Sequence, residues 1–523
     1  MRLRLRLRAP ELTATSETTF EVVVLGGGPA GCAAATLLAR RSHRVALVTP
    51  DTPPAAPLAE SIPPSTRRIV EELGFLDAVR SAGLHPNRGN TVWWAGAEPR
   101  VESFPDDRIG VHTDRRRLEQ ALLSAAEASG VAVYRGTTAR DAVESEDGWA
   151  VRAVRGDGPE LHLHAAWVVD ATGRHGLLAR REGREPDRST TTTALVRRWR
   201  RPGGWPQEFG GHTLIESYAD GWAWSVPLGH DLRCFTVMVD QRDGALDGND
   251  VGVTLERELS RASHLAALLR EAAPAGAAWA CPASLYTAPR FAREGLVLAG
   301  DAASFIDPLS SFGVKKALSS GWLAGIVLHT ALTDPPMTSA ALDFYDARER
   351  ATYRSYRAAS AEFFEEAASA HGTPYWGRRA EAARRASRGS SRGAALDSEP
   401  ADPLEPPLPE TEVRAAFDRI RAREVLRAEP GRSLRTVERP GVEGHRLVMR
   451  PHLASDRLPA GLRYVRDVDL SALVEVAPAH GQVPDGWAAY NGVAPPVSLP
   501  DYLTALATAF AAGLLEHGDD GDR

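Results

Sequence analysis

Lysine is almost missing from this chain of 523 residues. Of its 62 basic residues, 60 are arginine and two are lysine, and both lysines stand in the segment "DPLSSFGVKK", as Lys315 and Lys316. A GC-rich coding bias explains the arginines. The chemical consequence holds in any case, because a guanidinium stays protonated and cannot act as the nucleophilic amine that lysine provides. A reaction that depends on a lysine amine is therefore restricted to these two side chains.

Cysteine and metal-ligand clusters are scarce as well. Cys32, Cys234 and Cys281 lie far apart without paired spacing, which argues against a disulfide framework and a thiolate metal site. His162 and His164 share a strand face, but the sequence offers no third ligand, so we expect no metal. Unpaired cysteines fit a reducing compartment, and we expect the protein in the cytoplasm.

Long apolar runs and an excess of positive charge are also absent. The first twenty residues alternate Arg with Leu but lack the apolar core of a signal peptide, and the late apolar run near 505–515 is too short to span a bilayer. The net charge of -6 argues against nucleic-acid binding as the main role. We therefore expect neither a membrane nor a nucleic acid as a partner.

The pattern along the chain predicts an α/β protein of several parts. Strands and helices alternate early, and antiparallel-looking strands follow, which favours a Rossmann-like domain that carries an inserted β-rich substrate domain. A Pro, Gly, Ser and acid-rich segment then reads as a linker, followed by a small, mostly helical C-terminal domain. The predicted boundaries are a flexible N-terminus at 1–18, a main module at 19–387 with the insertion at about 188–290, a linker at 388–411 and the last domain at 412–523.

A glycine motif follows the first strand. "VVVLGGGPAGCAAA" places Gly26, Gly28 and Gly31 in G-x-G-x-x-G spacing, with Ala30 inside the turn, directly before a helix. This context predicts a dinucleotide site, in which the glycines allow a tight turn and a close backbone approach to a pyrophosphate at the helix N-terminus. The second strand ends at Thr49 instead of the usual ribose-binding acid, and either Thr49 or the later Asp51 could substitute.

Two later segments carry a family resemblance. "VVDATGRHG" and "GLVLAGDAASFIDPLSSFGVKKAL" resemble the second and third FAD fingerprints of the para-hydroxybenzoate hydroxylase superfamily, and "DRRRLEQALL" is similar to its flavin-contacting arginine segment. The resemblance covers Phe20 to about Ser387 and implies FAD as the cofactor. The residues that it implies for FAD binding, besides the glycine loop and Thr49, are Arg115, Asp170, Gly173, Gly300, Asp301, Pro308, Gly313 and Val314.

Within that superfamily the chain resembles the flavin-dependent halogenases. "GWAWSVP" is similar to their W-x-W-x-I-P signature, "ESIPPSTRRIVEELGF" to their G-E-S-L-x-P segment, and "DPLSSFGV" to their flavin turn. The resemblance implies that Trp222 and Trp224 wall the space between flavin and substrate, and that Ser310 and Ser311 lie in the turn. Glu60, in the segment beside the flavin, is the first candidate for an acid or base, with a surface or capping carboxylate as the alternative.

The groups specific to halogenation are missing. Those halogenases use reduced FAD and O2 to form a C4a-hydroperoxide that oxidises chloride, and a buried lysine on a strand after the G-E-S segment handles the oxidant. The matching region, "HPNRGNTVWWAG", has no lysine, and Ser310 replaces the glutamate of the tryptophan-specific enzymes. Lys315 and Lys316 follow the flavin turn instead, where we expect contacts to cofactor phosphate, an acid neighbour or solvent.

The sequence therefore predicts an FAD-dependent monooxygenase that uses reduced FAD and O2, through the C4a-hydroperoxide, to hydroxylate an electron-rich aromatic ring. Indole or tryptophan is the preferred ring, on a free, peptide-bound or carrier-bound substrate. A separate flavin reductase or NAD(P)H would supply the electrons. The alternatives are a halogenase, a flavin-dependent alkene reductase, and a non-catalytic flavoprotein that holds a peptide.

Overall fold

The computed structural model describes residues 18–51, 58–105, 110–188, 190–243, 250–387, 408, 410–423 and 425–518. The chain divides into two compact units, Met1–Pro400 and Ala401–Arg523. Most of the predicted N-terminal segment 1–18 and of the predicted linker 388–411 lies outside the described residues. None of the described helices is long and apolar enough to cross a membrane.

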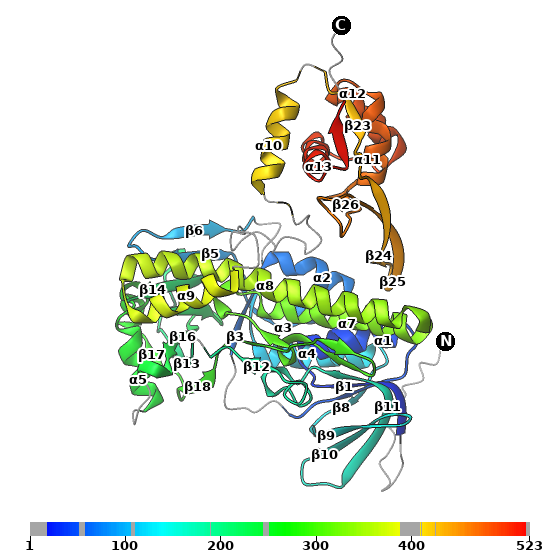
Figure 1. Ribbon diagram of the computed structural model, residues 1–523. Coiled ribbons are helices and arrows are strands. Elements are labelled where there is room, and N and C mark those ends of the chain that lie inside the picture. Colours follow the sequence, from blue (N-terminus) through cyan, green and yellow to red (C-terminus); the bar gives the residue numbers. More distant parts are fainter. Residues whose placement is uncertain are drawn as a thin grey trace, which may run out of the picture. The chain divides into compact units, whose positions relative to one another are not determined.

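A mixed sheet with a parallel centre organises the first unit (Figure 1). Strand β1 (Thr18–Leu25) lies between β11 (Glu160–Asp170) and β2 (Val45–Val48) and runs parallel to both. The four residues from Val22 to Leu25 are all fully buried, so both faces of the sheet are covered, and this is why the strand is a continuous apolar run. The other strands are β8 (Ala132–Tyr134), β21 (Leu296–Leu298), β20 (Ala292–Arg293) and the antiparallel pair β9 (Thr137–Ser145) and β10 (Gly148–Arg155).

Helix α1 (Pro29–Arg40) follows β1 and packs closely on α7 (Gly313–Thr333). Small residues make the close approach possible, because a side chain at Gly321 would clash with the carbonyl group of Ala30. Helix α4 (Arg115–Ala128) also packs on α1. The sequence therefore brings the start of α7, where both lysines lie, next to the glycine loop that opens α1.

A second, mostly antiparallel sheet forms the β-rich part. It runs in the order β17 (Ala273–Pro274), β13 (Thr192–Arg200), β16 (Leu232–Asp240), β15 (Gly221–Pro227), β14 (His212–Tyr218), β5 (Gly89–Trp93) and β6 (Arg100–Ser103), with β18 (Trp279–Pro282) on β13. Because β5 pairs in parallel with β14, this sheet also takes up strands that precede the 188–290 segment. Helices α5 (Val251–Leu259) and α6 (Ser263–Leu269) share an apolar cluster with it.

Short sheets and helices complete the first unit. One sheet joins β3 (Ala59–Ile62), β7 (Gly110–Asp114) and β4 (Gly83–Asn87), and another joins β12 (Glu185–Pro186), β19 (Tyr286–Thr287) and β22 (Ser304–Phe305). The remaining helices are α2 (Arg67–Glu72), α3 (Leu76–Ala82), the long α8 (Thr338–His371) and α9 (Pro374–Ser387). Figure 1 shows α8 extended alongside α7, and it packs on both α7 and α9. The left-handed Gly372 ends α8, and Pro374 starts α9.

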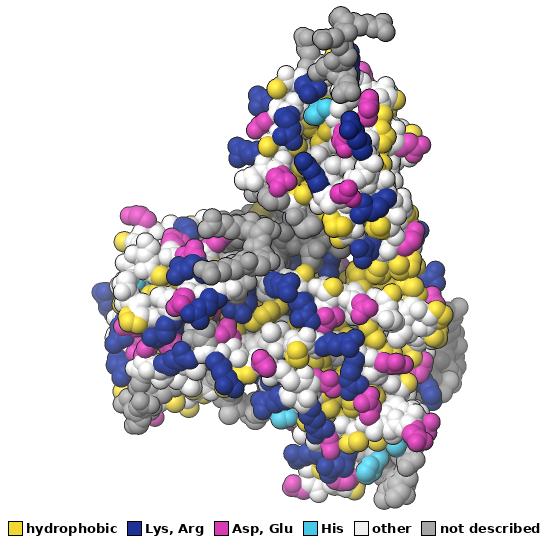
Figure 2. All heavy atoms as spheres, in the orientation of Figure 1, with side chains coloured by type: hydrophobic (Ala, Val, Ile, Leu, Met, Phe, Trp, Pro, Cys, Tyr) yellow, Lys and Arg dark blue, Asp and Glu magenta, His cyan; other side chains and the backbone are white. Residues whose placement is uncertain are grey.

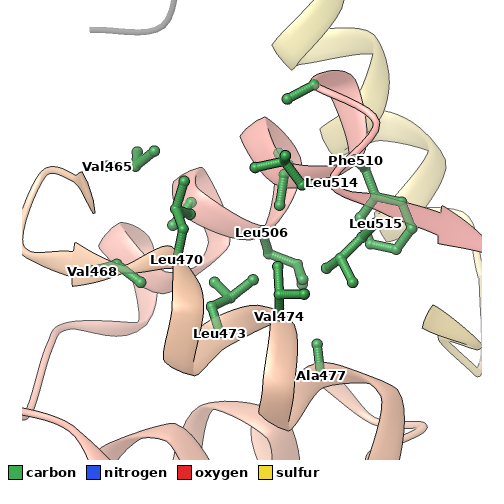
Figure 3. Packing of buried hydrophobic residues seen from close by; sticks show 14 of the residues in the cluster. Val465, Val468, Leu470, Leu473, Val474, Ala477, Leu506, Phe510, Leu514 and Leu515 are labelled. Atoms are coloured by element: carbon green, nitrogen blue, oxygen red, sulfur yellow. The ribbon is translucent and has the colours of Figure 1, made fainter. Parts of the chain in front are cut away.

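The second unit has its own apolar core. Its helices are α10 (Glu410–Arg421), α11 (Leu470–Val476), α12 (Val483–Val493) and α13 (Leu499–Ala511), and its strand pairs are β23 (Ala428–Pro430) with β28 (Leu515–His517), β24 (Arg435–Glu443) with β25 (Arg446–Ala454), and β26 (Tyr464–Val465) with β27 (Val468–Asp469). Figure 3 shows Leu473 and Val474 of α11 among Leu506, Phe510 and Leu514. Helix α13 thus packs its apolar residues into this core.

The surface mixes both signs of charge. Figure 2 shows basic and acidic side chains interspersed over the visible face. Many arginines are paired, as Arg293 is with Glu182 and Glu144 at 2.9 and 2.7 Å. This mixture accompanies the slightly negative net charge of the chain.

Candidate cofactor and substrate site

In the glycine loop, a side chain would clash with the backbone at Gly26 and Gly31 but would find room at Gly28. Gly26 has φ +105°, and a side chain there would clash with the carbonyl group of Ala171, while a side chain at Gly31 would clash with the carbonyl group of Gly26. At Gly28, the N-cap of α1, the one atom of the described residues that an added Cβ would meet is the Nη2 of Arg115, at 3.8 Å, and no described side chain caps the helix. The loop therefore leaves the positive N-terminus of α1 open for an anionic group.

Thr49 lies against this loop. Its Oγ1 donates to the carbonyl group of Pro50 at 3.2 Å. A Cβ placed on Gly27 would come within 2.7 Å of the same Thr49 Oγ1. Asp51 is exposed and faces Gly136 instead. Of the two candidates for the ribose contact, the one beside the glycine loop is Thr49, and its role stays a prediction.

Arg115 is held beside the loop by two carboxylates. Its Nη1 donates to Glu60 at 2.9 Å and its Nε to Glu119 at 2.7 Å. Burial lowers the pKa of Arg115, but the charges of Glu119 and Glu60 outweigh it and raise that pKa. The guanidinium is thus a fixed positive charge near Gly28. The carboxylate of Glu60, the candidate acid or base, is engaged in this ion pair.

Asp170 shapes a turn after β11. It is fully buried, and its oxygens accept hydrogen bonds from the N–H and the hydroxyl group of Thr172 and from the N–H groups of Leu178 and Ala179, at 2.6 to 3.0 Å. These bonds stabilise a turn in which Gly173 has φ +62°. Asp170 therefore stabilises the backbone of the predicted FAD fingerprint by hydrogen bonds.

The third fingerprint segment lies next to the first. Ala30 of the glycine loop packs against Gly300, where an added Cβ would come within 2.8 Å of the Ala30 Cβ. Asp301 follows, with 26% of its side chain exposed and its Oδ1 3.8 Å from the amine of Lys316. Segments 270 residues apart in the chain, at Ala30 and Gly300, thus lie side by side.

The predicted flavin turn is a short 3₁₀ helix, η7 (Pro308–Ser310). Asp307 caps it by accepting from the Leu309 N–H at 3.0 Å, and burial raises the pKa of Asp307. Ser311 has φ +55°, a left-handed conformation that a non-glycine residue adopts at some cost. Gly313 and the buried Val314 then begin α7. The side chain of Ser310 lies outside the described part of the chain.

The two predicted wall tryptophans lie on one face of β15. Trp222 and Trp224 stack with ring centroids 4.9 Å apart, and Trp94 meets Trp222 edge-on at 6.2 Å. Trp222 is 1% exposed and shares an apolar cluster with Leu309 of η7 and Phe364 of α8, while Trp224 is half-buried against that cluster. Sequence reasoning missed Trp94, whose position on this face depends on the β5–β14 pairing.

A narrow pocket opens beside the turn. Asp307, Thr192, Phe364 and Arg379 are among the residues that line it. Arg379 is 3% exposed, donates to Thr192 at 2.8 Å and pairs with Asp240 at 3.2 Å. The "TPYWGRR" segment that contains Arg379 therefore serves to anchor α9 to the β-rich sheet.

A buried polar chain adjoins β3, next to Glu60. Asn87 is 1% exposed and donates to Ser61 at 3.0 Å, the hydroxyl group of Ser61 lies 2.9 Å from that of Thr213, and Thr213 lies 3.1 Å from Nε2 of His112. Burial, with the nearby charge of Arg233, lowers the pKa of His112 well below its usual value. Asn87 belongs to the segment "HPNRGNTVWWAG", where the halogenase resemblance leads one to expect a lysine.

These residues fit FAD. The open Gly28 position at a helix N-terminus and the fixed charge of Arg115 suit a pyrophosphate, and the partly exposed Asp301 offers carboxylate oxygens beside the glycine loop. The η7 turn and the N-terminus of α7 adjoin it through Lys316. FAD bound there would supply redox chemistry that the amino acids themselves lack.

The comparisons with known proteins agree with this fit. The family model of the FAD binding domain matches residues 19–356. The flavin-dependent halogenase armH3 of Armillaria mellea is 27% identical over 369 residues, which cover 64% of this chain and 72% of that protein.

Two solved structures share the fold. CmlS, a flavin-dependent halogenase, matches with TM-score 0.76 at 21% identity over 98% of both chains. The peptidyl tryptophan dihydroxylase QhpG matches with TM-score 0.62 at 22% identity, over 95% of this chain and 100% of its own. At these identities the likeness is one of fold.

The predicted fold class and the predicted FAD cofactor are confirmed. The family also identifies the protein as an FAD-dependent oxidoreductase. The family model covers well over half of the 523 residues, and the glycine loop, the Asp170 turn and the Gly300–Asp301 turn all lie within it. The chain belongs to the FAD binding domain family, in its flavin-dependent halogenase-like branch.

Proposed function

We propose that this protein is an FAD-dependent monooxygenase that hydroxylates an electron-rich aromatic ring. The preferred ring is the indole of tryptophan, on a substrate that a peptide or a carrier protein presents. The enzyme thus shares the fold of the halogenase-like branch but transfers oxygen instead of halogen.

The position of the two lysines carries the proposal. The amine of Lys316 donates to the carbonyl groups of Ser304 and Gly300 at 2.6 and 3.2 Å, and its side chain is 1% exposed. Lys315 lies on the same helical turn, 5.4 Å from the ring centroid of Phe312. Since the chain has no other lysine, the β4–β5 segment beside the tryptophan wall has no amine to receive a halogen oxidant.

The residues of the site suit oxygen transfer to a ring. Bound FAD, once reduced, supplies the activation of O2. Trp224, half-buried beside the buried Trp222, offers an apolar ring for an aromatic substrate and helps to exclude water. Glu60 can accept a proton from a phenol or an indole N–H if substrate binding loosens its ion pair with Arg115. Ser311, held in the turn, is a candidate for orienting the reacting oxygen.

The partners belong to the same proposal. Reduced flavin comes from a separate reductase or from transient contact with NAD(P)H. QhpG, a chain of the same fold, is a peptidyl tryptophan dihydroxylase, and this supports a peptide-bound substrate here. The second unit, Ala401–Arg523, is our candidate for recognising that peptide or carrier.

Halogenation is the second candidate, because the curated relative and the CmlS structure are halogenases. A bromide test separates the two. The protein is incubated with FAD, a flavin reductase, NADH, O2 and excess bromide, with peptides that carry one tryptophan, and the product is analysed by mass spectrometry. We expect an added oxygen without the bromine isotope doublet. A brominated product would overturn the proposal, provided that a known halogenase brominates its own substrate in the same mixture.

A further inference from the structure

Lys316 is buried behind the Gly300–Asp301 turn. The whole residue is 3% exposed, and its amine donates to the carbonyl groups of Gly300 at 3.2 Å and Ser304 at 2.6 Å. The same amine lies 3.8 Å from Oδ1 of Asp301. One charged group therefore binds the backbone on both sides of Asp301 and faces the side chain of Asp301 as well.

Ser320, one turn further along α7, and residues of α8 hold the same turn. The N–H of Gly300 donates to the hydroxyl group of Ser320 at 2.8 Å, and that hydroxyl group donates to Glu349 at 3.0 Å. The hydroxyl group of Tyr345 lies 3.2 Å from Ser320 and donates to the carbonyl group of Leu298 at 2.9 Å. Both the N–H and the carbonyl group of Gly300 are thus fixed by buried side chains.

Charge explains why a lysine stands there. Burial raises the pKa of Glu349, which is 4% exposed, and the positive charge of Lys316 opposes that change. A lysine in the first turn of α7 is otherwise unfavourable, since it opposes the helix dipole and loses its hydration. Asp301, Glu349 and the two carbonyl groups together compensate a buried cation. Of these groups, Asp301 is the one that reaches the surface, with 26% of its side chain exposed.

We infer that Lys316 is a positioning residue for the cofactor, which fixes the turn and directs the carboxylate of Asp301 toward bound FAD. The inference rests on FAD as the cofactor and on Asp301 as its ligand. It is independent of whether the enzyme transfers oxygen or halogen. It also gives the rare lysine a role: its amine is committed to the cofactor turn.

The test is a double-mutant cycle read out by FAD affinity. Lys316→Met removes the amine, and Lys316→Gln keeps a hydrogen-bond donor without the charge. Each is made in the wild-type and in the Asp301→Asn background, and the apoproteins are titrated with FAD by flavin fluorescence. Arg385→Met, which removes an exposed basic side chain from α9, is the matched control. Thermal unfolding of each apoprotein reports the fold separately.

If Lys316 acts through Asp301, both Lys316 variants lower FAD affinity on the order of tenfold in the wild-type background and less than about threefold in the Asp301→Asn background. Arg385→Met leaves the affinity unchanged. Equal losses in both backgrounds would assign Lys316 to general stability and overturn the inference, as would wild-type affinity in a folded Lys316→Gln variant. If Asp301→Asn alone binds FAD as the wild type does, Asp301 is not a ligand and the inference fails, while the bromide test of the proposed function still stands.

Discussion

A substitution at Gly28 tests directly whether the FAD pyrophosphate binds at the glycine loop. Its backbone, at φ -74° and ψ -178°, is ordinary for any residue, and among the residues that the structure describes a new Cβ would contact Arg115 alone, at 3.8 Å. Gly28→Ala should therefore change the free energy of unfolding of the apoprotein by no more than about 1 kcal/mol. If a pyrophosphate approaches this backbone, the methyl group displaces it. The loss of one charge-assisted N–H bond, worth about 1.5 to 3 kcal/mol, lowers FAD affinity roughly 10- to 150-fold.

The assay for Gly28→Ala is a titration of the apoprotein with FAD, followed by flavin fluorescence, with thermal unfolding of the apoprotein beside it. Gly377→Ala is the matched control, because a Cβ on this helical glycine meets nothing within 4 Å. That variant should gain about 0.5 to 1 kcal/mol of stability and bind FAD as the wild type does. A Gly28→Ala protein with wild-type stability and an FAD affinity within twofold of the wild type would refute the placement of the pyrophosphate at α1.

Three further predictions concern the rest of the site. Asp170 accepts four hydrogen bonds, and Asp170→Asn would turn an N–H₂ group toward some of the same donors. The free energy of unfolding should therefore fall by about 2 to 4 kcal/mol, and an unchanged urea midpoint would contradict this. Because burial lowers the pKa of His112, the unfolded state binds the proton first, so stability is retained above pH 6.5 and falls below it by up to about 1.4 kcal/mol per pH unit. Between pH 7.5 and 5.5, His112→Gln should remove the contribution of His112 to the slope of the free energy of unfolding against pH. An unchanged slope would contradict this account of His112. Trp222→Ala should cost about 3 to 5 kcal/mol in urea unfolding, because Trp222 is 1% exposed. Trp224→Ala should cost less, because Trp224 is half-buried, and should raise the KM for the aromatic substrate; equal destabilisation by the two alanine substitutions would contradict the difference in burial.

Local patterns carried most of what the sequence could predict. The glycine loop, the turn after β11 and the Gly300–Asp301 turn each depend on a strand, a few backbone contacts and small residues, which short segments of sequence specify.

Contacts across long sequence separations were beyond such reasoning. The chain from Asn87 through Ser61 and Thr213 to His112 joins four strands from separate parts of the sequence, and no local pattern specifies their alignment. The pairing of β5 with β14, which brings Trp94 to Trp222, is of the same kind. Lys316 shows the limit clearly: an acid neighbour was among the expected contacts, but its full burial depends on how α8 covers α7.

The central claim is that oxygen, and not halogen, is transferred from this scaffold to an aromatic ring. Its most direct test is turnover under isotopically labelled O2 in the presence of chloride, with reduced FAD and a tryptophan-containing peptide, followed by mass analysis of the product. We expect one labelled oxygen atom per hydroxylated ring and no chlorine. A chlorinated product, or a hydroxylated product whose oxygen comes from unlabelled water, would contradict the proposal.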